Sequence, residues 1–170
     1  ILKVDDTVEI RPGRVVIEKN QQVWKPLATK ITSLNSGGED LGQVGPGGSI
    51  GVLTSLDPSI VKSDQLTGSV VGLPGKLPKV WNELILDVHL LQRVVGTKEE
   101  LTVEPIKMSE ALMLNVNSAA TVGIVIELRK NRIKCRLKLP VCADAGQRVT
   151  ISRRIGNRFR LIGYGEIVEK

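Results

Sequence analysis

Arginine and lysine are concentrated in one part of this sequence. Eleven of the 24 basic residues lie between residues 127 and 160, and only two acidic residues lie there. Residues 1–80 are nearly balanced, with nine basic and eight acidic side chains. A local excess of positive charge attracts polyanions and accelerates their approach, but it also keeps a surface soluble. The charge alone therefore leaves two interpretations open, nucleic-acid binding and a solvated outer face.

The other residues that could do chemistry do not form a catalytic or metal-binding set. Gly75 and Lys76 are followed by leucine, whereas a phosphate-binding loop needs serine or threonine there. We expect His89, the single histidine, on the polar face of a strand with no nucleophile to activate. Cys135 and Cys142 lack the further ligands that zinc requires, so we expect free thiols rather than a metal site or a disulfide. The sequence therefore predicts no enzyme active site, metal or cofactor in this chain.

Apolar and polar residues alternate along much of the chain, which predicts β-strands. Between residues 132 and 139 every second residue is apolar and the others are cationic, so four cations share one face of a strand. Further strand-like runs occupy residues 84–90, 111–116, 122–128 and 148–152 and, in the N-terminal half, residues 7–10, 14–18, 27–34, 49–56 and 68–73. Many short strands separated by Gly, Pro, Asn and Asp predict an all-β sandwich or barrel.

One segment separates two complete sets of strands. Residues 73–78 contain two prolines and a glycine, a composition typical of a linker. We therefore expect an all-β chain of two small β-barrels in tandem, at residues 1–76 and 77–170, because closing a small sheet removes its exposed edges. No apolar run is long enough to span a bilayer, so we expect no membrane contact. The chain begins in mid-pattern without methionine, which suggests a fragment.

Several runs occur in an order and at a spacing that match a known family. In the N-terminal half they are Leu-Lys-Val at 2–4, Val-Glu-Ile-Arg-Pro-Gly at 8–13, Gly-Pro-Gly-Gly-Ser-Ile-Gly-Val at 45–52 and Leu-Asp-Pro at 56–58. In the C-terminal half they are Pro-Val-Cys at 140–142, Gly146, Ile-Ser-Arg-Arg-Ile at 151–155 and Arg-Leu-Ile-Gly-Tyr-Gly at 160–165. Together they resemble domains II and III of the gamma subunit of eukaryotic and archaeal translation initiation factor 2, a relative of elongation factor Tu.

The resemblance covers essentially the whole chain and implies a role. It implies that the first barrel is domain II without its first strands, and that the GTPase domain, which would bind GTP and magnesium and contact the beta subunit, is missing. The whole factor would act in the cytoplasm as a heterotrimer that delivers methionylated initiator tRNA to the small ribosomal subunit. An ATP-grasp assembly factor would hold the second barrel while the heterotrimer forms.

The resemblance also implies site residues in the first barrel. Asp57 matches the loop that docks the alpha subunit, although an aspartate before Pro58 could simply cap that turn. Gly47, Gly48 and Thr54 would border the pocket for the acceptor end of the tRNA.

In the second barrel, the positions that would face small-subunit ribosomal RNA are Arg93, Arg154, Asn157, Arg158 and Arg160. Asn157 stands where the family usually has lysine, a loss for which Arg158 could compensate. Since the chain has only four aromatic residues, we expect contact through phosphates rather than stacked bases. Two alternatives remain open: the barrels of another translational GTPase of the elongation-factor type, and a structural adaptor with an incidental basic surface.

Overall fold

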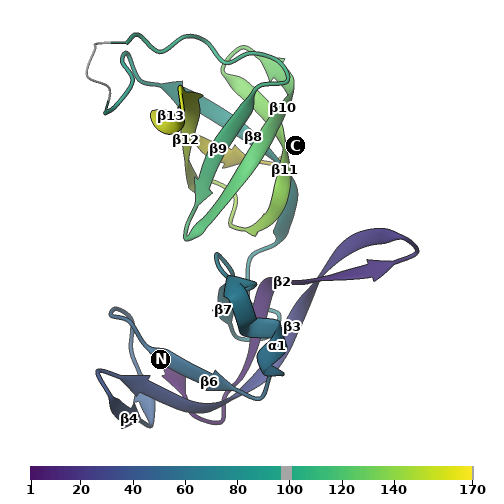
Figure 1. The fold of residues 1–170 in the computed structure, drawn as a ribbon, viewed down its shortest axis with the longest axis vertical. Helices are drawn as coiled ribbons and strands as arrows, with labels where there is room; N and C mark the ends of the chain where they lie inside the picture. The colour runs from purple at the N-terminus through teal and green to yellow at the C-terminus, as the bar shows by residue number, and fades with distance from the viewer. Residues whose placement is uncertain (97–100, 170) are drawn as a thin grey trace. The chain divides into compact units, whose positions relative to one another are not determined.

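The computed structural model describes residues 1–96 and 101–169, and it confirms the all-β prediction. The chain divides into two compact units, Ile1–Leu77 and Pro78–Lys170. Unit 1 is a curled sheet that forms half a barrel, and unit 2 is a closed barrel (Figure 1). The boundary proposed from the sequence, between residues 76 and 77, lies one residue before the division between the units. Among the described residues, no helix is both long and apolar enough to cross a membrane.

Unit 1 is organised around one long hairpin. Its strands are β1 (Leu2–Lys3), β2 (Thr7–Glu18), β3 (Gln21–Ser36), β4 (Glu39–Leu41), β5 (Gln43–Val44), β6 (Gly51–Thr54) and β7 (Val70–Gly72). The main sheet has the order β4-β3-β2-β7; β6 also pairs with β3, and β1 pairs with β5. A short helix, α1 (Pro58–Val61), and a 3-10 turn (Lys62–Asp64) follow β6. Val8, Ile31 and Leu34 form the small buried core.

Two strands of unit 1 are longer than the sequence predicted. Residues 7–10 and 14–18 both belong to β2, because a bulge between Ile10 and Arg14 bends the strand without ending its pairing with β3. The strand β3 begins earlier than expected, at Gln21, and pairs with β2 along its first part and with β4 and β6 along its second part. The sequence analysis did not predict the single turn of helix at α1.

Unit 2 is a six-stranded antiparallel barrel. Its strands are β8 (Val80–Leu90), β9 (Ala111–Val116), β10 (Ala119–Arg129), β11 (Arg132–Cys142), β12 (Arg148–Ile155) and β13 (Arg158–Val168). They close in the order β10-β11-β8-β13-β12-β9. Closure pairs every strand on both sides, so the barrel has no free edge on which another chain could add a strand.

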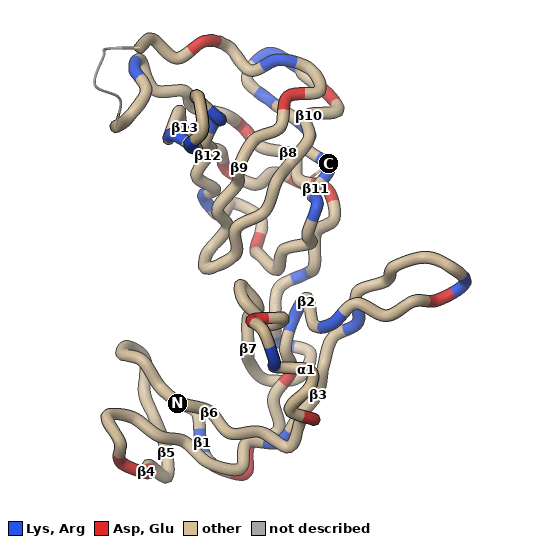
Figure 2. Tube along the Cα trace, viewed as in Figure 1, with Lys and Arg blue, Asp and Glu red and all other residues tan. Residues whose placement is uncertain are grey.

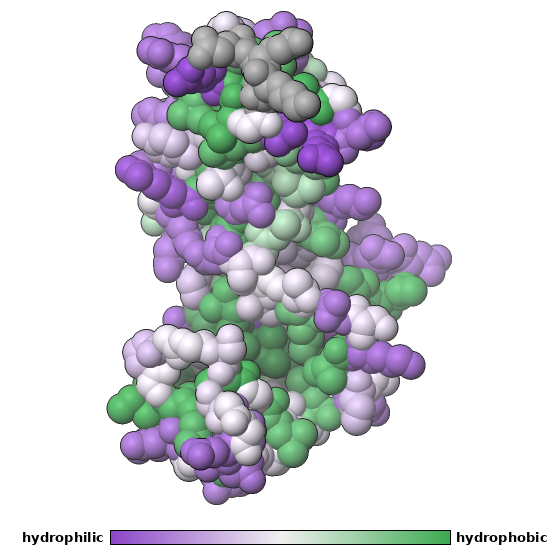
Figure 3. Space-filling view, turned by 60° about the vertical axis from the view of Figure 1, so that its left-hand side comes forward, coloured by the Kyte–Doolittle hydropathy of each residue, from purple (hydrophilic) through white to green (hydrophobic). Residues whose placement is uncertain are grey.

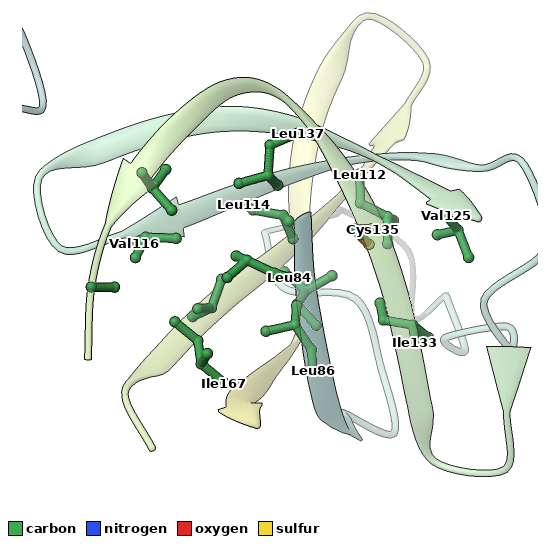
Figure 4. Packing of buried hydrophobic residues seen from close by; sticks show 14 of the residues in the cluster. Leu84, Leu86, Leu112, Leu114, Val116, Val125, Ile133, Cys135, Leu137 and Ile167 are labelled. Carbon is green, nitrogen blue, oxygen red and sulfur yellow. The ribbon is translucent and has the colours of Figure 1, made fainter. Parts of the chain in front are cut away.

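Alternation along the strands fills the barrel with aliphatic side chains. Leu84 and Leu86 from β8 meet Leu112 and Leu114 from β9 in the interior, and all four are fully buried (Figure 4). Burying a leucine side chain stabilises a fold by about 1.5–3 kcal/mol. In β11, the apolar residues between 132 and 138 point inward and the cations point outward, as predicted for this part of the strand. The prediction was wrong for Leu139, which is 48% exposed, because the ladder with β8 shifts register between Arg136 and Val141.

The topology of the barrel places two hairpin turns at the same end. β8 is antiparallel to both β11 and β13. The β10–β11 turn and the β12–β13 turn therefore both project at the end where β8 finishes, next to the segment that follows Leu90. The β9–β10 turn and the β11–β12 connection lie at the other end.

Candidate nucleic-acid interface

The β12–β13 hairpin carries most of the residues expected to face RNA. Arg154 lies opposite Phe159 in the ladder, and Arg153 lies opposite Arg160. Cross-strand partners point to the same face and neighbours along a strand to opposite faces. Arg158 therefore shares a face with Arg160, whereas Arg154 points to the other face together with Phe159. The structure brings the predicted arginines to one tip but divides them between its two faces.

Arg153 is held by the protein itself. Its guanidinium forms an ion pair with the Glu110 carboxylate, with Nη2 donating to Oε2 at 3.1 Å. Nη1 donates to the Glu104 carbonyl oxygen at 2.9 Å, and Nη2 donates to the Pro105 carbonyl oxygen at 3.1 Å. The Arg153 and Glu110 side chains are each only 17% exposed. Arg153 therefore fastens the segment before β9 to β12 and carries little free charge.

Of the remaining arginines of the tip, Arg154 and Arg158 are exposed, whereas Arg160 is half-buried and its Nη1 lies close to Gly96. Arg154 is exposed, and its Nε donates to the Gly156 carbonyl oxygen at 3.3 Å, across the turn that contains Asn157. Within residues 1–96 and 101–169, no carboxylate forms an ion pair with Arg154, Arg158 or Arg160. Cationic groups without a carboxylate partner remain available for an anionic ligand. Asn157 is exposed at the turn itself.

The segment after β8 runs beside this tip. The amides of Leu91 and Val95 donate to the carbonyl oxygens of Ile162 at 2.9 Å and Leu161 at 3.2 Å. Arg93 lies between these two amides, is exposed and forms an isolated bridge with Thr102. The predicted residue Arg93 is therefore carried on a segment that is bonded to the same strand as Arg160.

The cationic face of β11 is partly neutralised. Lys134 Nζ lies 2.8 Å from Glu83 Oε2 and 3.7 Å from Glu127 Oε1, and Arg136 Nε lies 3.4 Å from Glu83 Oε1. The hydrogen bond from Lys134 lowers the pKa of the Glu83 carboxyl, and the same contact raises the pKa of Lys134. Lys138 is exposed. Much of the positive charge on this face is therefore matched by carboxylates within the barrel. Figure 2 marks the positions of Lys and Arg along the trace.

Phe159 is a feature that the sequence analysis missed. Its side chain is 41% exposed and shares a face with Arg154 at the hairpin tip. His89 and Tyr164 stack with ring centroids 4.9 Å apart, and the Arg148 guanidinium lies 5.0 Å from the Tyr164 ring. The signal for Phe159 was an aromatic residue between two arginines in a strand, where alternation puts it on the outer side of the barrel.

In unit 1, Asp57 is the N-cap residue of helix α1. Its Oδ1 accepts a hydrogen bond from the Ser59 amide at 2.8 Å and caps α1, as the Asp-Pro sequence allowed. Hydrogen bonds from Ser59 lower the pKa of the Asp57 carboxyl, so the group is charged at neutral pH. Asp57 is exposed, which leaves its second oxygen accessible.

The three residues assigned to a tRNA pocket flank β6. Gly47 and Gly48 are exposed and have φ of +96° and +76°, a backbone conformation that favours glycine. Thr54 ends β6, is half-buried, and its Oγ1 accepts from the Leu56 amide at 3.4 Å. The conformation of the loop is by itself enough to explain the two glycines.

No nucleotide or metal site is formed by the residues that the structure describes. None of their His, Cys, Asp and Glu side chains form a group of three or more that could hold a metal ion. The Gly75 amide donates to the Glu9 carboxylate at 2.8 Å, so this Gly-Lys pair binds a side chain of the protein instead of cradling a phosphate. Cys135 and Cys142 are both buried, and Cys142 Sγ donates to the Pro78 carbonyl oxygen at 3.2 Å.

Comparison with known proteins identifies the family. Residues 82–167 match the sequence profile described as "Initiation factor eIF2 gamma, C terminal". The chain belongs to the eIF2 gamma family. It is 54% identical over 167 residues to "Translation initiation factor 2 subunit gamma" of Methanocaldococcus jannaschii, a match that covers 98% of this chain and 41% of the relative. The protein of the same name from Pyrococcus furiosus is 54% identical over 168 residues, with 99% of this chain and 41% of the relative covered.

The family assignment confirms the resemblance seen in the sequence, including its extent. Both eIF2 gamma relatives align with nearly the entire chain, so units 1 and 2 both correspond to parts of an eIF2 gamma protein. The chain spans 41% of the length of these relatives.

Proposed function

We propose that this chain is the non-catalytic, RNA-facing part of a translation initiation factor 2 gamma subunit. In the whole factor, a GTPase domain outside this chain would bind GTP and magnesium and contact the beta subunit. The heterotrimer would deliver methionylated initiator tRNA to the small ribosomal subunit in the cytoplasm. The observation that carries the proposal, beyond the family match, is the group of arginines at the β12–β13 tip that form no ion pair with a carboxylate of residues 1–96 and 101–169.

Unit 2 supplies the face for small-subunit ribosomal RNA. Arg154, Arg158 and Arg160 extend from a rigid hairpin, and Arg93 lies on the adjoining segment. Guanidinium groups bind phosphate oxygens through charge-assisted hydrogen bonds and need no particular base sequence. Asn157 at the turn adds a neutral donor. An ATP-grasp assembly factor would hold the same unit before the heterotrimer is complete.

Unit 1 supplies the contacts for the alpha subunit and for the tRNA. Asp57 presents a charged oxygen next to Val61, an exposed apolar residue of α1. Ile17, at 76% exposed, and Leu53 are further exposed apolar residues of unit 1. Figure 3 shows hydrophobic side chains at the surface on one face of the molecule. Exposed apolar patches with a polar rim are typical of protein interfaces. Gly47, Gly48 and Thr54 would border the pocket for the tRNA acceptor end, with the GTPase domain as the opposite wall.

A retention experiment tests the proposal. The 170-residue chain is immobilised and offered purified alpha subunit and purified small ribosomal subunits in separate assays. We expect the chain to retain both, and to bind initiator tRNA poorly because one wall of the pocket lies outside it. Retention of neither would contradict the proposal, and retention of the alpha subunit alone would contradict the RNA-facing role of unit 2.

A further inference from the structure

The β10–β11 hairpin ends in a second cationic tip, formed by Arg129, Lys130 and Arg132 around Asn131. Arg129 lies opposite Arg132, so Lys130 and Asn131 form a two-residue turn. All four side chains are exposed, Arg129 to 83%. Because the flanking ladder fixes the backbone of the turn, only the side chains of the three cations have to be ordered on binding.

The cations of this tip are poorly matched by carboxylates. The closest ion-pair contact of Arg129, to Glu127, spans 3.6 Å, which is too long for a strong hydrogen bond. Asp87 lies opposite Arg132 in the ladder, but the two do not form an ion pair within 4.0 Å. Across the described ranges 1–96 and 101–169, no ion pair involves Lys130 or Arg132.

The surface around the tip is hollowed. A cavity of about 460 Å³ is lined by Arg129, Arg132 and Lys134 together with the carboxylates Glu127 and Glu169. Another, of about 490 Å³, is lined by the four residues of the tip, 129–132, together with Asp87. A third, of about 470 Å³, has Lys130 and Asn131 on one side and the apolar end of the barrel on the other. A phosphate group could enter these hollows and meet more than one cation.

The two cationic tips project from the same end of unit 2. Arg132 pairs with Asp87 on β8, three residues before Leu90. Leu90 pairs with Gly163 on β13, and Arg160 lies three residues further along β13 in the direction of the tip. At about 3.3 Å per residue, this places Arg132 and Arg160 about 20 Å apart along the strands. Two tips at this spacing would meet different phosphates of one RNA.

We propose that Arg129, Lys130 and Arg132 form a second contact for RNA phosphates, which binds the same RNA as the β12–β13 tip. The inference rests on the proposed function, because it takes unit 2 to face ribosomal RNA. A protein partner fits the tip less well, since residues 129–132 include no apolar or aromatic side chain that could serve as an anchor.

The test uses the 170-residue chain and an RNA duplex of about 16 base pairs, long enough to present two successive minor grooves. The variant is Lys130→Gln with Arg132→Gln. The control is Lys138→Gln with Arg148→Gln, which removes the same charge from exposed positions away from the tip. Affinity is measured by fluorescence anisotropy over a range of salt concentrations, and folding is checked by thermal unfolding.

The tip variant should lose about tenfold or more in affinity, and the slope of log affinity against log salt should fall by about 0.9 for each lost phosphate contact. The control should lose clearly less. If the double variant is unstable, the single variant Arg132→Lys is used as well. Because it keeps the charge, it should retain most of the RNA binding. Equal losses in variant and control, or no loss in either, would overturn the inference.

Variants of the β12–β13 tip separate this inference from the proposed function. If Arg154→Ala with Arg160→Ala weakens RNA binding and the Lys130 and Arg132 variant does not, the second contact is wrong and the proposed function stands. If only the Lys130 and Arg132 variant weakens binding, the RNA site lies at the β10–β11 tip and the assignment of Arg154 and Arg160 fails. Loss of a protein partner with unchanged RNA affinity would also overturn the inference.

Discussion

Arg153 and Arg154 are adjacent in the sequence, yet their side chains point to opposite faces of the same hairpin. Arg153 is clamped by the Glu110 carboxylate and two backbone carbonyl oxygens, whereas Arg154 faces solvent. The division follows from the two-residue period of a strand. It separates an arginine that stabilises the barrel from one that is free to bind a ligand.

Replacing Arg153 should therefore affect stability first. Arg153→Ala leaves Glu110 without its partner in a poorly hydrated position, and we expect the free energy of unfolding to fall by about 2–3 kcal/mol. Arg154→Ala should change it by less than about 0.5 kcal/mol. Urea unfolding followed by circular dichroism measures both. Equal effects of the two substitutions would contradict the division of roles.

Asp57 has two roles that can be separated by substitution. Asp57→Ala removes both the cap of α1 and the charge, whereas Asp57→Asn keeps a capping oxygen and removes only the charge. If the carboxylate docks the alpha subunit, both variants should lose retention of that subunit with unchanged circular dichroism. Wild-type retention by Asp57→Asn would show that the residue acts only as a cap.

Gly13 is required by the bulge in β2. Its φ is +91°, and a Cβ added there would lie 1.9 Å from the Lys25 carbonyl oxygen. We expect Gly13→Ala to lower the free energy of unfolding of unit 1 by about 3 kcal/mol or more, because backbone must move to relieve the clash.

The matched control for this prediction is Gly42→Ala, which meets no atom within 4 Å. Gly42→Ala should change stability by less than about 0.5 kcal/mol. In a Trp81→Phe background, the fluorescence of Trp24 reports the unfolding of unit 1 alone. A Gly13→Ala variant as stable as the control would show that the bulge can relax.

Because of the buried Cys135 thiol, we expect the free energy of unfolding of unit 2 to vary with pH in the alkaline range. Burial raises the pKa of the Cys135 thiol to about 12, from an ordinary value of 9.0. Between these two values the unfolded chain loses the thiol proton and the folded chain keeps it, so stability falls as pH rises. The difference in unfolding free energy between wild type and Cys135→Ala should shrink between about pH 9 and about pH 11. A difference that stays constant with pH would contradict this.

The sequence was most informative where one periodicity extends over several residues of a regular strand. In β11, alternation correctly predicted which of residues 132–138 face the core, because a closed barrel buries one face of every strand. It was less informative in unit 1, where the bulge at Gly13 joins two predicted strands into one and where α1 is too short to show a helical period. The cap by Asp57 was foreseen because it depends only on residues next to it.

The different roles of Arg153 and Arg154 could not be derived from the sequence in the same way. The carboxylate that binds Arg153 lies 43 residues away along the chain, and only closure of the barrel brings it to β12. A count of basic residues in the sequence treats both arginines as available charges. It also includes Lys134, whose charge is matched by Glu83 and Glu127. Long-range ion pairs decide which cations of a basic segment remain available.

The most direct measurement of the central claim is the salt dependence of binding between the 170-residue chain and small-subunit ribosomal RNA. If unpaired arginines bind phosphates, log affinity should fall steeply and linearly with log salt, with a slope of about 0.9 per phosphate neutralised. Arg154→Ala with Arg160→Ala should reduce that slope by nearly 2, and lower affinity by about 1 kcal/mol or more. A flat salt response, or a slope that the double substitution leaves unchanged, would show that the cationic tip is only a solvated surface.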